Sequence, residues 1–203
     1  MTTEASSKLE AIVLAGGAGS RFGGQKLTAP WRGGALIDGA LASAFAAPVR
    51  RVIVVTGADA KVAKAARDFA LRAGQAARLR IVDAPDHAEG MAATLRAGIA
   101  ALPDDVAGVY VFLGDMPHAP TAILPGLAEA LARGAAAVAP TFDGARGHPV
   151  LFGRSLFPAL AALNGDEGAR RVLSTLGDRL VSVPSPDPGI LFDVDQPGDL
   201  ASP

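Results

Sequence analysis

Short apolar segments alternate with alanine-rich segments along most of this sequence, and this alternation constrains the fold more than any other feature. Five runs have the apolar character of buried strands, and they are Leu9–Ala15, Arg51–Thr56, Leu79–Asp83, Gly108–Leu113 and Ala135–Ala139. The segments between these runs have helical character and lie at about 35–46, 60–73, 91–102 and 121–133. This order predicts a mainly parallel sheet with helices on both faces and right-handed crossovers.

The rhythm changes after Pro140. We expect a turn and a strand at 144–153, helices at Ser155–Leu163 and Asp166–Leu176, and short apolar runs near 180–183 and 190–194. No internal repeat or low-complexity linker divides the chain. The sequence therefore predicts one α/β domain over residues 1–203, of Rossmann-like class, with an elaborated C-terminal third.

Composition excludes several kinds of protein. The chain has 19 basic and 20 acidic residues, which argues against nucleic acid or a membrane surface as the main partner. It has no cysteine and only 3 histidines, so a bound metal should have oxygen ligands, as Mg²⁺ does. No apolar stretch approaches a membrane span, and the first eight residues lack the pattern of a secretory signal. We expect a soluble, cytoplasmic protein.

A glycine-rich loop, Leu14–Leu27, follows the first predicted strand and carries the strongest functional signal. Its glycines allow close approach of a ligand, and successive backbone N–H groups in such a loop form an anion site. Arg21 and Lys26 add two cations suited to phosphate oxygens. The loop lies at the carboxyl end of a strand, where ligands bind in open parallel sheets.

Two common phosphate-binding motifs each fail here by one residue. The dinucleotide pattern G-x-G-x-x-G fits Gly17 and Gly19, but Phe22 stands at its third position. The Walker pattern fits Gly19 and Gly24, but Gln25 stands where the lysine belongs. An ordinary glycine-rich turn is the structural alternative, and the two cations count against it.

Acidic residues follow two later apolar runs. Asp115 comes directly after Gly108–Leu113, at the same predicted sheet edge as the glycine-rich loop, where it can bind magnesium or simply cap a turn. Asp193 and Asp195 point the same way if their segment is extended, because side chains alternate with period two. We expect Asp199 to cap or solvate the terminal turn.

The glycine-rich loop resembles that of MobA-like nucleotidyltransferases, whose pattern is L-A-A/G-G, three variable residues, R-F/M-G and then lysine. The matching residues are Leu14, Ala15, Gly16, Gly17, Arg21, Phe22, Gly23 and Lys26. The resemblance extends from Leu9 to Leu200 and implies the nucleotide-diphospho-sugar transferase type of fold. It also implies transfer of a nucleoside monophosphate from a nucleoside triphosphate to a phosphate-bearing acceptor, with release of pyrophosphate.

The resemblance assigns roles to individual residues. It implies catalytic roles for Arg21, Lys26 and Asp115, and metal binding by Asp115 and Asp195. The implied nucleotide-binding residues are Leu14, Ala15, Gly16, Gly17, Arg21, Lys26, Gly90, Met91 and Thr94. The implied acceptor-binding residues are His148, Asp166 and Arg170. Thr94 and Gln196 depart from the family pattern, which has serine and threonine at these places. As alternatives, His148 is a structural turn residue and Arg170 belongs to a basic helix face.

Within the family, the spacing of Arg21 and Lys26 and the segments RGHPVLF and GDEGARRVL resemble the cytidylyltransferases of molybdenum cofactor synthesis. The resemblance then implies a nucleotide-binding part at about 9–118, an acceptor-binding part at about 119–203, Mg²⁺ or Mn²⁺ as cofactor, and molybdopterin as acceptor. Gly16 instead resembles the guanylyltransferase branch, so GTP is one alternative, and a sugar 1-phosphate acceptor is another. We expect a monomer that hands its product to a molybdoenzyme or its chaperone.

Overall fold

The strand β1 (Leu9–Ala15) lies at the centre of the structure, and all of its residues are buried. The computed structural model describes residues 8–17, 22–57, 59–165 and 168–201. Ala11 and Val13 contribute to one hydrophobic core, and Ile12 and Leu14 contribute to the other. The strand therefore has an apolar layer on each face, which explains its continuous apolar sequence.

Parallel pairing extends the sheet on both sides of β1, to β4 (Val52–Thr56) and to β6 (Gly108–Leu113). The strand order is β10-β7-β9-β6-β1-β4-β5, and the other strands are β5 (Leu79–Asp83), β7 (Ala137–Phe142), β9 (Val150–Gly153) and β10 (Leu180–Pro184). β9 runs antiparallel to its neighbours β6 and β7, while β10 is parallel to β7. The short β8 (Ala145–Arg146) pairs with β7. The predicted mainly parallel sheet is confirmed.

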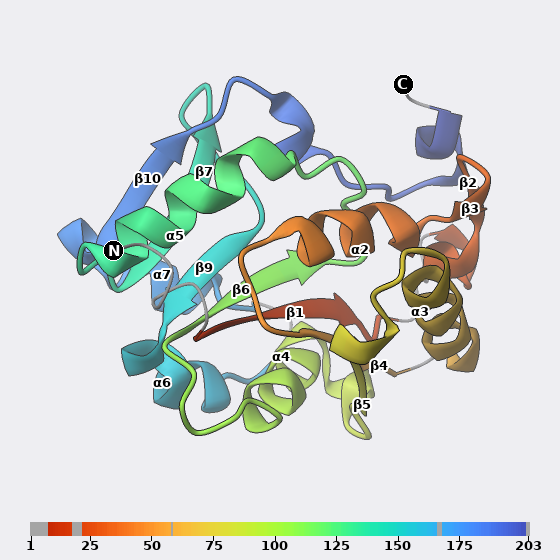
Figure 1. Cartoon of the computed structure of the whole chain (residues 1–203), viewed down its shortest axis with the longest axis horizontal. Coiled ribbons are helices and arrows are strands. Elements are labelled where there is room, and N and C mark those ends of the chain that lie inside the picture. The colour runs from red at the N-terminus through yellow and green to blue at the C-terminus, as the bar shows by residue number, and fades with distance from the viewer. Residues whose placement is uncertain (1–7, 18–21, 58, 166–167, 202–203) are drawn as a thin grey trace.

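Helices cover both faces of the sheet, as predicted (Figure 1). One layer contains α2 (Ile37–Ala46), α3 (Ala60–Arg72) and α5 (Leu124–Ala132). The opposite layer contains α4 (Met91–Ala100), α6 (Phe157–Ala161) and α7 (Arg170–Ser174). Among the described residues, no helix has both the length and the apolar character needed to cross a bilayer.

Four local expectations are confirmed only in part. Strand β5 is only half-buried because it lies at the sheet edge and has one neighbour. Strand β7 begins at Ala137 rather than Ala135 and continues to Phe142, since its register follows its partners β9 and β10. Within the described part of Asp166–Leu176, the α-helix is limited to α7. The segment Ser155–Leu163 is a 3₁₀ turn followed by the short α6.

A small hairpin between the glycine-rich loop and α2 was not predicted. Its strands are β2 (Pro30–Trp31) and β3 (Gly34–Ala35). The turn between them has positive φ at Arg32, 45°, and at Gly33, 82°. Two left-handed residues suit a tight hairpin turn, but an arginine at the first of them gives no recognisable turn signal in the sequence.

Candidate active site

Three charged side chains from distant parts of the sequence meet at the carboxyl edge of the parallel strands. The Nζ atom of Lys26 lies 2.9 Å from Oδ2 of Asp115 and 3.5 Å from Oδ1 of Asp195. The Lys26 side chain is 10% exposed, whereas those of Asp115 and Asp195 are 32% and 49% exposed. The ammonium group is therefore enclosed, while both carboxylates stay accessible from solvent.

The turn after β6 places Asp115 beside the end of β1. The backbone N–H of Gly114 donates to the carbonyl of Leu14 at 2.9 Å. A Cβ at Gly114 would lie 3.0 Å from that same carbonyl, so the turn passes close to β1. The N–H of Val194 donates to the Asp115 carbonyl at 3.0 Å and joins the C-terminal segment to this turn. Backbone contacts alone thus bring the two carboxylate-bearing segments together.

The chain around Asp195 is fixed by its neighbours. Val194 is fully buried, and the two aspartates on either side of it remain partly or fully exposed, as the period-two pattern predicts. Oδ2 of Asp199 accepts hydrogen bonds from the N–H groups of Asp195, at 2.9 Å, and Gln196, at 2.7 Å. These bonds lower the pKa of Asp199 and confirm its capping role. Gln196 contributes only its backbone N–H to this cap.

Asp193 belongs to the same electrostatic cluster. Burial raises the pKa of Asp193, and the negative charges of Asp195 and Asp115 raise it further, while Lys26 opposes the shift. Negative charge is therefore concentrated at this edge beyond what Lys26 neutralises. A cation at the same place would relieve the repulsion among the three carboxylates.

The donor set suits a hard divalent cation that arrives with phosphate. The enclosed ammonium of Lys26 already acts as a stand-in cation between Asp115 and Asp195. Within the described residues, no group of three or more metal-ligating side chains is arranged to hold a metal. Mg²⁺ often binds through one or two carboxylates, with substrate phosphates and water as its other ligands. The residues present fit that arrangement.

The glycine-rich loop approaches the start of α4. A Cβ at Gly16 would lie 2.5 Å from Oγ1 and 3.1 Å from Cγ2 of Thr94, a buried residue, so only glycine fits beside this threonine. Gly17 is exposed, and nothing lies within 4 Å of a Cβ placed there. Arg21, expected in the same loop, lies outside the described residues. Leu14 and Ala15 end β1 as buried residues.

The three residues before Lys26 have left-handed backbone conformations, which direct Lys26 toward Asp115 and Asp195. Gly23, Gly24 and Gln25 have positive φ values of 89°, 96° and 48°. Glycine adopts such values without a steric penalty, whereas glutamine does so at some cost. A short 3₁₀ helix, Lys26–Thr28, starts immediately afterwards. The two glycines therefore have a structural purpose in turning the chain toward Asp115 and Asp195.

One residue near this loop was missed by sequence reasoning. His87 donates from Nδ1 to the Ala84 carbonyl at 2.9 Å and is partly buried. A Cβ at Gly57 would lie 2.7 Å from both the Gly16 carbonyl and the Cβ of His87. The His87 side chain therefore packs beside the glycine-rich loop. No local motif signals this contact.

A large cleft lies next to the charged cluster. Its volume is about 1180 Å³, and Leu14, Met91 and Asp193 are among its lining residues. Much of the wall is apolar, and its basic residues are Arg146, His148, Arg170 and Arg171. The structure thus places two of the expected acceptor-side residues, His148 and Arg170, in one cleft, while Asp166 lies outside the described residues. Arg146 and Arg171 are cleft residues that the sequence did not single out.

Gly90 and Met91 stand where the cleft meets α4. Gly90 has φ of 108° and immediately precedes the helix, and Met91 is an exposed hydrophobic residue at its first position. The N–H of Ala92 donates to the Gly165 carbonyl at 3.1 Å, which joins this helix to the segment before α7. Met91 therefore lies between the glycine-rich loop side and the arginine side of the cleft.

His148 is a neutral residue of the cleft wall. Burial lowers the pKa of His148, and Arg170 lowers it further, although the Val111 carbonyl and the charge of Asp115 oppose the shift. The Nδ1 atom of His148 is buried and has no hydrogen-bond partner among the described residues. The backbone N–H of His148 donates to the Ile190 carbonyl at 2.9 Å. The residue thus combines a structural contact with an unsatisfied polar atom beside the cleft.

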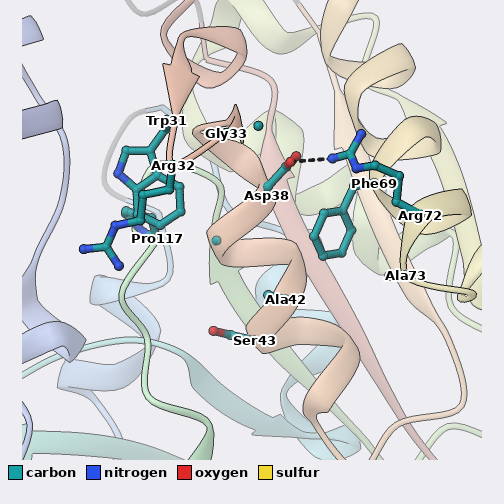
Figure 2. A pocket seen from close by; sticks show the side chains of 12 residues that line it. Trp31, Arg32, Gly33, Asp38, Ala42, Ser43, Phe69, Arg72, Ala73 and Pro117 are labelled. Atoms are coloured by element: carbon teal, nitrogen blue, oxygen red, sulfur yellow. Dashed lines mark hydrogen bonds and ion pairs between the residues drawn. The ribbon is translucent and has the colours of Figure 1, made fainter.

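A second, smaller pocket of about 550 Å³ lies over α2 and α3 (Figure 2). Trp31 and Pro117 line one side of it, and Phe69 and Arg72 line the other. Arg72 pairs with Asp38 at 2.7 Å. Burial raises the pKa of Asp38, and the guanidinium of Arg72 opposes this shift. Pro117 lies two residues beyond Asp115, so this pocket lies behind the turn that carries the cluster.

Residues 11–180 match the MobA-like NTP transferase domain. The molybdenum cofactor cytidylyltransferase of Escherichia coli K12 is 28% identical over 197 residues, covering 96% of this chain and 94% of that protein. A homologue of Mycobacterium tuberculosis Rv0371c from Mycobacterium sp. strain JC1 is 26% identical, with a TM-score of 0.76 and 96% of both chains covered. Rv0371c from M. tuberculosis H37Rv, in complex with manganese, is 21% identical, with a TM-score of 0.67 and 88% of both chains covered.

These similarities agree with the geometry of the cluster and the cleft. The match to the domain spans most of the chain, including the glycine-rich loop and Asp115. The solved structures share the fold over nearly the whole length. The protein is a nucleotidyltransferase that belongs to the MobA-like NTP transferase family.

Proposed function

We propose that this protein transfers CMP from CTP to the phosphate of molybdopterin or its molybdenum-loaded form, and releases pyrophosphate. The observation that carries the proposal is the convergence of Lys26, Asp115 and Asp195 beside the 1180 Å³ cleft. Two carboxylates and a cation suit a triphosphate with its metal, and the adjoining cleft has room for a second substrate. The similarity to the cytidylyltransferase of E. coli supports the choice of substrates.

Asp115 and Asp195 would hold the divalent cation, Mg²⁺ or Mn²⁺. When bound, this cation neutralises phosphate charge and makes the α-phosphorus a better electrophile. The manganese complex of Rv0371c supports a divalent cation in this fold. Lys26 would then exchange part of its contact with the two carboxylates for contact with phosphate oxygens, which a point charge on a flexible stem can do.

The protein's own groups would orient the substrates and stabilise charge. The backbone N–H groups of Gly16 and Gly17 would bind phosphate oxygens, and Lys26 and Arg21 would offset charge at the α-phosphate. The acceptor phosphate is already ionised at neutral pH because its second pKa is about 6, so no general base is required. One acceptor oxygen forms a bond to the α-phosphorus in line with the departing pyrophosphate.

The cleft lining favours a flat heterocyclic acceptor over a sugar phosphate. Apolar side chains such as Leu95, Val111 and Phe152 line the cleft, and they offer no hydrogen bonds to the hydroxyl groups of a sugar. Arg170, with Arg146 and Arg171, would bind the acceptor phosphate. Nδ1 of neutral His148 would accept a hydrogen bond from a ring N–H group. Asp166 occupies the matching family position on this side.

Gly16 is compatible with CTP, although it resembles the guanylyltransferase pattern. The cytidylyltransferase pattern has alanine at this place and serine at position 94. Here glycine is paired with threonine, and Cγ2 of Thr94 lies 3.1 Å from where an alanine Cβ would lie. The Ala–Ser pair of the cytidylyltransferase pattern and the Gly–Thr pair of this chain have the same number of methyl groups. In the first pair the methyl group is at position 16, and in the second it is at position 94, so either pair fills the space beside the nucleotide.

The pairing of these two positions has a direct test. Gly16→Ala alone should lower the transfer rate at least tenfold because its methyl group would contact Thr94 at 2.5 Å. The double variant Gly16→Ala with Thr94→Ser should regain most of the loss, with CTP still preferred. A double variant that prefers GTP would contradict the proposed compensation, as would a double variant no better than Gly16→Ala.

The proposed activity is tested by measuring pyrophosphate release with each of the four nucleoside triphosphates, with and without molybdenum cofactor. We expect release with CTP and Mg²⁺ only when the cofactor is present. Preference for GTP would instead identify a guanylyltransferase, and activity with a sugar 1-phosphate would contradict the acceptor. Nucleotide binding without turnover on any acceptor would indicate a nucleotide sensor.

The proposal includes a monomeric enzyme that passes its product to a molybdoenzyme or its chaperone. The open mouth formed by Met91 and the arginine side of the cleft would allow a bulky dinucleotide to leave. Light scattering during size-exclusion chromatography would measure the oligomeric state. A stable dimer with the cleft covered would contradict this route of release.

A further inference from the structure

Three aromatic side chains from separate segments pack against one another behind the charged cluster. The rings of Trp31 and His118 are 5.6 Å apart at 72°, and those of His118 and Phe192 are 4.9 Å apart at 63°. Both contacts have the edge-to-face geometry that aromatic pairs prefer. We call Trp31, His118 and Phe192 the aromatic clasp.

Each member of the clasp lies close in sequence to one group of the charged cluster. Trp31 follows Lys26 by five residues, and His118 follows Asp115 by three. Phe192 precedes Asp195 by three residues. The clasp therefore connects the same three chain segments that meet at the cluster, through a second set of contacts.

The central ring is anchored to the body of the protein. The Ala119 carbonyl next to His118 accepts a hydrogen bond from Oγ of Ser43 in α2 at 2.6 Å. A Cβ at Gly39 of α2 would lie 2.6 Å from Pro117, on the other side of His118 in the chain. The turn that carries His118 is thus pressed onto α2, and Trp31 and Pro117 line the same pocket (Figure 2).

The C-terminal segment is seated on that anchored ring. A Cβ at Gly189 would lie 3.1 Å from the Cβ of His118, so the segment crosses close to the histidine. The Val194–Asp115 hydrogen bond of 3.0 Å fixes one point of the segment, and the Phe192 ring on His118 fixes a second. The backbone of the segment is also held at Ile190, whose carbonyl accepts from the His148 N–H, and at Asp195, whose N–H donates to Asp199. The Phe192 ring on His118 adds a side-chain contact, which sets the spacing between this segment and the turn that carries Asp115.

The His118 ring acts here as an apolar spacer. Its Nε2 atom is buried without a hydrogen-bond partner among the described residues. Burial lowers the pKa of His118, and the neighbouring Arg32 lowers it further, while Asp187 opposes the shift. The guanidinium of Arg32 also covers the Trp31 ring at 4.8 Å. The neutral imidazole therefore contributes its shape and its ring edges to the clasp.

We propose that His118 is a positioning residue, which sets the spacing of the segments that carry Lys26, Asp115 and Asp195 through its contacts with Trp31 and Phe192. The inference rests on the proposed function, since it concerns the affinity of that site for a divalent cation with nucleoside triphosphate. In this proposal His118 acts through Trp31 and Phe192 rather than by contact with either ligand. Its loss lets Asp195 move relative to Asp115, and the pair then binds the cation less tightly.

The test is a titration with Mn²⁺, followed by electron paramagnetic resonance, on full-length protein with CTP present and the acceptor omitted. We expect His118→Ala to weaken Mn²⁺ binding about 5- to 20-fold, because the side-chain contact that spaces the two segments is lost. His118→Phe keeps an aromatic ring and should bind Mn²⁺ within about twofold of the unaltered protein, since Nε2 makes no bond to lose.

A matched control separates positioning from general stability. Phe45 and Phe69 form another aromatic pair, 6.2 Å apart, on the α2–α3 side. Phe69→Ala should lower the melting temperature without changing the Mn²⁺ affinity. If His118→Ala does not fold, Phe192→Leu removes the second contact from the exposed side and should weaken Mn²⁺ binding in the same way.

The outcomes are distinguishable. Unaltered Mn²⁺ affinity in folded His118→Ala or Phe192→Leu would overturn the positioning role and leave the proposed function standing. Weak binding in His118→Phe, equal to that in His118→Ala, would also overturn it, because the ring would then not be the relevant feature. Failure of the unaltered protein to bind Mn²⁺ with CTP would overturn the proposed function and this inference together.

Discussion

Ionic clusters lie at both ends of the central strands, and they differ in how deeply the acidic side chain next to the central strand β1 is buried. At the amino ends, Glu10 of β1 is 0% exposed and receives a hydrogen bond from Nε of Arg50 at 3.1 Å. The two terminal nitrogens of Arg50 bind both oxygens of Asp105, at 2.7 and 3.0 Å. At the carboxyl ends, Lys26 faces Asp115 and Asp195, whose side chains are 32% and 49% exposed.

The comparison separates a structural ion pair from a site prepared for ligands. Arg50 uses its planar fork on the carboxylates of Glu10 and Asp105, which engage its Nε, Nη1 and Nη2 atoms. Lys26 is a compact cation between two accessible acids, an arrangement that exchanges partners readily. Under the proposed function, similar charges serve stability at one edge of the sheet and ligand binding at the other.

The largest effect is expected from Lys26→Ala. Removal of this cation should lower the rate of nucleotidyl transfer by about a hundredfold to a thousandfold, since one preorganised group of this kind commonly contributes 10² to 10³. The melting temperature should change little, because Asp115 and Asp195 remain hydrated. Pyrophosphate release and a thermal melt measure the two quantities, and a variant with ordinary turnover would contradict the assignment.

At the opposite edge, Arg50→Met should act on stability instead. Glu10 would remain buried without its cation, and breaking a buried pair of this kind costs about 3 kcal/mol, somewhat less here because Arg50 is partly exposed. Urea unfolding measures the loss. The double variant with Glu10→Gln should regain part of it, and the turnover of the folded protein should stay near normal. If Arg50→Met lost turnover but kept its stability, the cluster at the amino ends of the strands would not be purely structural.

The two edges should also respond to pH with opposite signs. Burial raises the pKa of Glu10 above its ordinary 4.5, so the folded state holds this proton more tightly than the unfolded state. The stability of the protein relative to Glu10→Gln should therefore fall as pH rises from about 4.5. Asp199 has a lowered pKa, so stability relative to Asp199→Asn should rise as pH increases toward 3.8. Unfolding curves across this range test both signs.

The smallest effect is expected from a pair that belongs to neither edge. Lys64 and Asp68 lie one turn apart on α3, 2.6 Å from each other, and both are well exposed. Asp68→Ala should cost about 0.3–0.5 kcal/mol in unfolding free energy and leave turnover unchanged. If Asp68→Ala lowered the unfolding free energy by several kcal/mol, exposure would not explain why the Lys64–Asp68 pair contributes less than the Arg50–Glu10 pair.

Much of the fold could be predicted from the sequence, because the hydrophobic periodicity and the length of a segment determine locally whether it forms a strand or a helix. The strands Leu9–Ala15, Leu79–Asp83 and Gly108–Leu113 have the predicted bounds, and the helices lie on both faces as expected. Strand β7 was misplaced because its register depends on β9 and β10, which are far away in sequence. The hairpin after the glycine-rich loop was missed because Arg32 adopts a conformation that its side chain does not favour.

Part of the candidate site could be predicted from the sequence, because the topology of a parallel sheet determines which strand ends lie together. Carboxyl ends of neighbouring parallel strands meet, so Asp115 could be placed near the glycine-rich loop from strand order alone. The approach of Asp195 to Lys26 depended on the family resemblance, since no local pattern brings the C-terminal segment to this edge. Arg146 and the contact of His118 with Phe192 arise from tertiary packing, which the sequence does not encode locally.

A crystal structure with Mn²⁺ and a non-hydrolysable CTP analogue tests the central idea most directly. The anomalous signal of manganese should lie between the carboxylates of Asp115 and Asp195, with the triphosphate beside it and Lys26 on a phosphate oxygen. A manganese ion bound elsewhere, or a triphosphate away from these three residues, would contradict the account.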